Sequence, residues 1–180
     1  MSNRSRKVPE GNPNVRVPGE PDSPQNKLRG ELYSEAFDRM SQGLSDGRYF
    51  EVIAIADSVI TDRIQSVTQT ILHEEPEQYI HTAIGVAVHA LMSELKDRQL
   101  ELDPEFISLI KEINTTSKWI QNRNEVTHGF VVVTPKSVDQ SIEDRQRKLQ
   151  ETAELGARFA MEITQIATKV IRDLKRDSSE

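Results

Sequence analysis

The 180-residue chain contains no cysteine and no long run of apolar residues. Without cysteine there is no disulfide, no thiolate metal ligand and no cysteine nucleophile, and such a chain is expected in a reducing, cytoplasmic setting. No apolar run approaches the roughly 18 residues that a membrane-spanning helix needs. Residues 1–27 also lack a hydrophobic stretch, so we expect neither a membrane span nor a secretory signal.

Glycine is scarce as well, with 8 residues and no cluster, which argues against the glycine-rich loops that bind nucleotide phosphates. The 4 histidines include no His-Glu-x-x-His pair, and we therefore expect no metal ion or other cofactor. The net charge of −6 argues against a broad nucleic-acid-binding surface, which is normally basic. It leaves room for a small site at which a few cations meet phosphates.

Proline is concentrated at the start of the chain, where residues 1–27 hold five of the eight. Such a segment cannot bury enough apolar area to offset the cost of ordering it, and we expect a disordered arm. Its cations either attract RNA or an acidic partner, or only keep the arm solvated. The remaining residues, 28–177, are expected to form one helical domain.

Hydrophobic periodicity predicts an all-α fold, an up-and-down bundle of about five helices. The expected helices are Leu28–Leu44, Phe50–Leu72, Tyr79–Arg98, a helix opened by Asp103 and Pro104, and a last helix that starts with a Ser137/Gln140 capping box and reaches about Lys175. The weak helix formers at 114–117 are expected to kink the fourth helix or to restart it. Otherwise it continues unbroken into the segment that carries the most chemistry.

That segment is Trp119–Phe130, which places Arg123, Asn124 and His128 within six residues. On a helix, Asn124 and His128 share a face and Arg123 projects beside them. An arginine can hold a phosphate in its fork, and a histidine can move a proton near pH 7. Together they are the minimal parts for cleaving RNA through its own 2′-hydroxyl.

A purely structural interpretation of the same residues stays open. His128 precedes Gly129, and a histidine in the last turn of a helix suits the negative end of the helix dipole. Trp119 is expected in the core or in a dimer interface rather than as a platform for base stacking. Asp57, on the largely apolar second helix, either pairs with a buried cation such as Arg123 or lies on the exposed edge.

The Arg-Asn-x-x-x-His pattern near the end of a small helical bundle resembles the HEPN superfamily, over roughly residues 28–177. The resemblance implies a metal-independent endoribonuclease, in a toxin or defence role, whose two subunits form a composite cleft. The family's arginine maps to Arg123, its polar follower to Asn124 and its histidine to His128. A subgroup paired with a nucleotidyltransferase antitoxin has tyrosine two residues after the histidine, where this chain has Phe130.

The expected partners are therefore RNA, a second copy of the chain and an antitoxin or regulatory protein. Two histidines, one from each copy, would act as base and acid, with Lys118 and Arg123 attracting the substrate. Cleavage would leave a 2′,3′-cyclic phosphate and a free 5′-hydroxyl. The alternative is a non-catalytic, dimeric helical interaction module or adaptor, in which the motif serves only the interface.

Overall fold

The computed structural model describes residues 24–72, 83–132 and 139–177, and this part of the chain is helical with no strand. The predicted all-α fold is confirmed. The helices are α1 (Pro24–Ser45), α2 (Tyr49–Leu72), α3 (Ile84–Asp97), α4 (Pro104–Lys111), a π-helical turn η2 (Glu112–Thr116), α5 (Trp119–Gly129) and α6 (Ile142–Asp177). Residues 1–23 of the predicted arm, and residues 79–82 of the predicted third helix, lie outside the described residues. Residues 24–27, predicted to belong to the arm, form the start of α1 instead.

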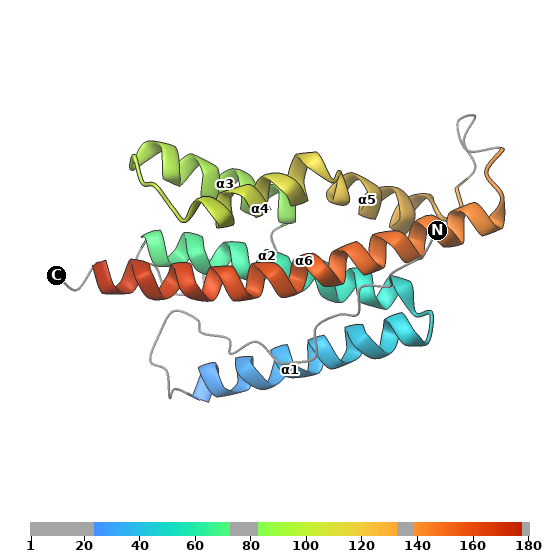
Figure 1. The fold of residues 1–180 in the computed structure, drawn as a ribbon, viewed down its shortest axis with the longest axis horizontal. Coiled ribbons are helices and arrows are strands. Elements are labelled where there is room, and N and C mark those ends of the chain that lie inside the picture. Colours follow the sequence, from blue (N-terminus) through green and yellow to red (C-terminus); the bar gives the residue numbers. More distant parts are fainter. Residues whose placement is uncertain (1–23, 73–82, 133–138, 178–180) are drawn as a thin grey trace, which may run out of the picture.

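The helices lie in three layers (Figure 1). Helices α2 and α6 form the middle layer, α1 lies on one side of them, and α3, α4 and α5 lie on the other. Most of α2 is buried, because it packs against α1, α3 and α6 at once. Helix α6 extends along the whole molecule and covers α2 on one side and the α4–α5 segment on the other.

A polar cluster joins α1 to α2 within this otherwise apolar core. Arg63 has no exposed surface, and its Nε donates to the hydroxyl of Tyr33 over 2.5 Å. Its Nη2 donates to Asp62 over 2.7 Å and to Ser66 over 3.2 Å. Asp62 also accepts from Tyr33 and from Arg29, so the buried guanidinium has both a counter-charge and hydrogen-bond acceptors.

The predicted fourth helix is broken before the motif. Its start is as expected, since Asp103 accepts a hydrogen bond from the Glu105 amide over 2.9 Å. The helix widens into η2, where the Ser117 amide donates to the Glu112 carbonyl over 2.9 Å. Lys118 then takes a left-handed conformation, with φ of 54°, and α5 begins at the next residue. The weak helix formers therefore restart the helix, and α5 is free to take its own direction.

The predicted start of the last helix is wrong. Gln140 precedes the helix, and its proposed capping partner Ser137 lies outside the described residues. Ser141 is the capping residue instead, because its hydroxyl accepts from the Asp144 amide and donates to the Asp144 carboxylate, each over 3.0 Å. Sequence patterns favoured the earlier serine because two capping motifs overlap here. Ile142, the first residue of α6, is 68% exposed.

Trp119 anchors α5 to α6. Its ring is fully buried, its Nε1 donates to the Thr152 carbonyl over 3.0 Å, and it meets Phe159 edge to face at 6.4 Å between ring centroids. Lys148 of α6 pairs with Glu125 of α5, and Arg158 of α6 pairs with Glu112 of the η2 turn that precedes α5. The expectation that Trp119 packs in the core is confirmed, and α5 is consequently held on α6 at its first residue.

Candidate functional site

Arg123 reaches from α5 to Asp57 on α2, which is one of the two arrangements expected for Asp57. Arg123 Nη2 lies 3.0 Å from Asp57 Oδ1, and the side chains are 18% and 31% exposed. The contact is an ion pair by distance but lacks hydrogen-bond geometry, because Asp57 Oδ1 and Arg123 Nε are both buried without a hydrogen-bond partner in the described part of the chain. The pair is therefore partly desolvated and touches at a single corner of the guanidinium.

The electrostatics of Asp57 reflect this incomplete pairing. Burial raises the pKa of the Asp57 carboxyl, and the positive charge of Arg123 offsets only part of that increase. An acid in a fully formed pair would have a lowered pKa, as Asp62 does. There, desolvation is outweighed by Arg63, Arg29 and the Tyr33 hydrogen bond, which together lower the pKa. The charged form of Asp57 is consequently less favoured in the folded chain than the charged form of Asp62.

A second contact joins α2 and α5 two helical turns away. The rings of Phe50 and Phe130 meet edge to face, 5.2 Å apart between centroids and at an interplanar angle of 83°. Phe50 precedes Asp57 by seven residues and Phe130 follows Arg123 by seven residues, so the two helices run antiparallel. The aromatic contact and the ion pair together fix the end of α5 against the start of α2.

Asn124 and His128 lie on the exposed surface of α5, and no hydrogen bond or ion pair of their side chains is found within the described residues. His128 is five positions after Arg123, so their side chains leave the helix about 140° apart and about 7.5 Å apart along its axis. Arg123 faces α2 while Asn124 and His128 face solvent. The structure brings Arg123 together with Asp57 and does not bring it together with His128.

The end of α5 differs from the arrangement in which Gly129 terminates the helix directly after His128. Helix α5 continues through Gly129 and is capped by Phe130, whose φ and ψ of −60° and −41° are right-handed. Gly129 is therefore not a left-handed residue that terminates the helix. His128 does lie in the last turn, where a cation would suit the helix dipole.

The predicted supporting cation, Lys118, is exposed at the other end of α5, three turns from His128. Between them, Glu125 accepts hydrogen bonds from Lys148 and Gln121, and its pKa is lowered chiefly by the Lys148 hydrogen bond. Because of this carboxylate, α5 does not present a continuous basic surface. Lys118 and Arg123 are separate local charges.

An apolar group follows the motif and was not predicted from the sequence. This end patch consists of the exposed side chains of Phe50, Val131, Val132 and Ile142 and the half-buried ring of Phe130, and Val131 is 86% exposed. Arg145 of α6 donates to the carbonyls of Phe130 and Val132 over 3.1 Å and 3.3 Å, which ties the segment to the helix. Single exposed apolar residues are ordinary, whereas large contiguous groups of them are typical of contact surfaces.

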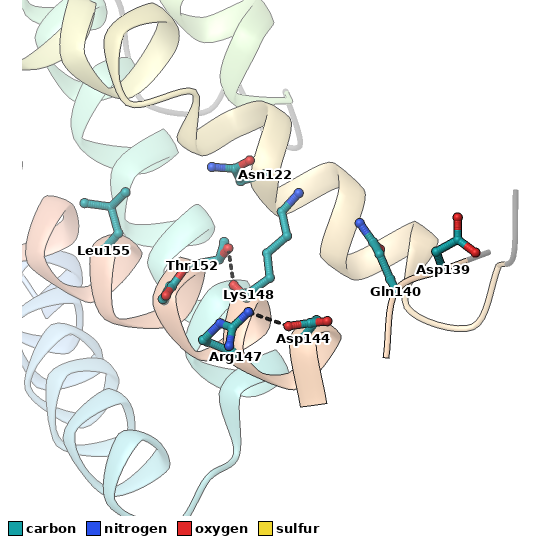
Figure 2. A pocket seen from close by; sticks show the side chains of 9 residues that line it. Asn122, Asp139, Gln140, Asp144, Arg147, Lys148, Thr152 and Leu155 are labelled. Carbon is teal, nitrogen blue, oxygen red and sulfur yellow. Dashed lines mark hydrogen bonds and ion pairs between the residues drawn. The ribbon is translucent and has the colours of Figure 1, made fainter. Parts of the chain in front are cut away.

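A cavity of about 570 Å³ lies between α5 and the start of α6 (Figure 2), and Arg123 is not among its lining residues. Figure 2 shows the Asn122 amide above it, Lys148 extending toward α5, and Arg147 paired with Asp144 at its floor. Asp139 and Glu151 add two further carboxylates to the lining. Its acids outnumber its cations, so the cavity is poorly suited to an RNA phosphate, and it contains none of the three motif residues.

Among the residues that the structure describes, no group of acids and histidines could hold a metal ion, and no helix could cross a membrane. Comparison with protein-family models, with curated proteins and with solved structures gives no match for this chain.

Proposed function

We propose that the chain is a metal-independent endoribonuclease of HEPN type, whose active site forms between two copies and contains Arg123, Asn124 and His128. The observation that carries the proposal is the exposure of His128 and Asn124 on one face of α5, while the half-buried Arg123 of the same helix is held by α2. A free imidazole is available to a ribose hydroxyl, and a held guanidinium is available to a phosphate.

The roles follow from the chemistry of each side chain. His128 takes the proton of the 2′-hydroxyl or delivers one to the leaving 5′-oxygen. Arg123 stabilises the extra negative charge that develops on the phosphate oxygens, and Asn124 donates to one of those oxygens or orients the imidazole. Lys118 contributes to capture of the RNA by its charge.

A second copy is required for two reasons. General acid–base cleavage needs a base and an acid, and each chain offers one histidine at the motif. The 140° divergence of Arg123 and His128 also directs these two side chains of one copy away from a common phosphate. The end patch, which starts immediately after the motif, supplies apolar surface for a two-fold contact that would bring both copies of His128 together.

The second candidate is the non-catalytic dimeric module, and the Arg123–Asp57 ion pair favours it. An arginine that serves only to hold α5 on α2 would make this contact and need no substrate. The two candidates differ in the role of His128, which has no structural partner in the described residues to explain its presence.

Product analysis tests the proposal. Single-stranded RNA incubated with the purified chain in EDTA should yield fragments that end in 2′,3′-cyclic phosphate and begin with a 5′-hydroxyl. Metal-dependent nucleases leave other ends and stop in EDTA. Cleavage that requires added metal, or products with 5′-phosphates, would contradict the proposal.

A further inference from the structure

We infer that Asp57 is a positioning residue, which directs the guanidinium of Arg123 toward the substrate phosphate while leaving most of its N–H donors unused. The inference rests on the proposed function, and it assigns a role to a residue outside the motif. Asp57 would not touch the RNA. It would act through Arg123.

The form of the ion pair supports this role. A guanidinium has five N–H donors in a planar fork, and arginine–carboxylate pairs are frequently bidentate. Here one nitrogen, Nη2, lies 3.0 Å from Asp57 Oδ1, while Nε remains buried without a hydrogen-bond partner among the described residues. The carboxylate therefore fixes one corner of the fork and does not occupy the rest of it.

The packing of α5 does not depend on the Arg123–Asp57 ion pair, because aromatic rings hold both ends of the helix. Phe50 and Phe130 already hold the end of α5 on α2, and Trp119 holds its beginning on α6. Both ends of this short helix are thus fixed by buried or half-buried rings. The ion pair lies between them, where the main freedom left to restrict is that of the Arg123 side chain itself.

The charge of Asp57 has a definite consequence for substrate. A carboxylate 3.0 Å from the guanidinium lowers the local positive potential that a phosphate meets, so Asp57 weakens RNA binding. In return it restricts the guanidinium to one direction, and misplacement by about 1 Å can cost a hundredfold in rate. Removing the charge should therefore strengthen binding and slow the chemical step, which a merely structural residue would not do.

The experiment measures kcat and KM for single-stranded RNA with wild type, Asp57→Asn, Asp57→Glu and the control Asp38→Asn. Asp38 is an exposed acid on α1, and its variant should match wild type. For Asp57→Asn, kcat should fall about tenfold to a hundredfold while KM also falls. Asp57→Glu keeps the charge and should recover part of kcat, and it replaces the asparagine variant in the test if that variant does not fold. Wild-type kcat and KM in a folded Asp57 variant would overturn the inference.

A second readout separates this inference from the proposed function. The Nε–H proton of Arg123, assigned in NMR spectra by its loss in Arg123→Lys, should be protected from water in wild type because the atom is buried. Asp57→Asn should abolish that protection. If wild type does not cleave RNA and the protection is lost in the variant, the proposed function fails and the positioning stands. Protection that is unchanged in the variant contradicts the positioning whether or not RNA is cleaved.

Discussion

The indole ring of Trp119 lies against the backbone of Gly156, so closely that a methyl group at Gly156 would meet three ring atoms at 2.9–3.1 Å. The ring cannot easily move away, because it is fully buried and donates to the Thr152 carbonyl. Glycine is therefore required on α6 by the packing of the helix that carries the motif.

Gly156→Ala should lower the free energy of unfolding by about 1–3 kcal/mol, the usual cost of overpacking a core. Urea denaturation of wild type and variant measures the difference. The matched control is Gly30→Ala on α1, where a methyl group would meet nothing within 4 Å. The control should be neutral or stabilise the chain by up to about 1 kcal/mol, because alanine is the better helix former. Equal behaviour of the two variants would show that the ring tolerates the methyl group.

Tyr33→Phe should destabilise the chain by about 1–3 kcal/mol, because it removes a hydrogen-bond acceptor from the fully buried Arg63. The control is Tyr49→Phe at the half-buried start of α2, for which a change within about 0.5 kcal/mol is expected. Both are measured by urea denaturation at neutral pH. A loss no larger in the first variant than in the second would indicate that Arg63 finds another acceptor.

The stability that Asp62 contributes should depend on pH in a defined direction. Its pKa is lowered from 3.8 because Arg63, Arg29 and the Tyr33 hydrogen bond outweigh desolvation, the largest single effect. An acid whose pKa is lower in the folded state stabilises it above its unfolded pKa, and this contribution is lost as the pH falls through the folded pKa. The stability difference between wild type and Asp62→Asn should therefore be constant from pH 7 to about 5 and shrink below about pH 4. If the stability difference between wild type and Asp62→Asn grew as the pH fell, the pKa of Asp62 would be raised on folding and not lowered.

The end patch should control self-association. Val131→Glu places a charge on a side chain that is 86% exposed and therefore costs the monomer little, but in a two-fold contact it would bury two like charges. Light scattering should show a dimer for wild type and a monomer of about half that mass for the variant. Val86→Glu on α3, where the valine is 57% exposed, should remain dimeric. A wild-type monomer at micromolar concentration would contradict the dimer itself, and a dimeric Val131→Glu would place the contact elsewhere.

Local sequence signals predicted the features of the fold that depend on local chemistry. The all-α class, the α1–α2 boundary and the Asp103 cap follow from hydrophobic periodicity and capping preferences. The predicted start of α6 was wrong because Ser137 and Ser141 are both capping residues by type, and it is Ser141 that caps the helix. Sequence periodicity also gave no indication that Arg63 is buried, because its acceptors include Tyr33, thirty residues away.

In the candidate site, too, some features follow from the local sequence and others depend on how the helices pack. The exposed pair of Asn124 and His128 follows from their spacing on one helix. The Asp57–Arg123 contact was one of two alternatives, because the direction of α5 depends on the η2 turn and on the left-handed Lys118. The end patch was not predicted, since its members come from three segments that meet only in the folded chain.

The most direct test of the central claim is the rate at which His128→Ala cleaves single-stranded RNA in EDTA, measured beside wild type. His89→Ala, which removes an exposed histidine on α3, is the matched control and should keep the wild-type rate. The account predicts that His128→Ala loses at least ~100-fold, the size of a general acid–base contribution, and that Arg123→Ala loses a comparable amount. Equal rates for wild type and His128→Ala, or no cleavage by wild type, would contradict it.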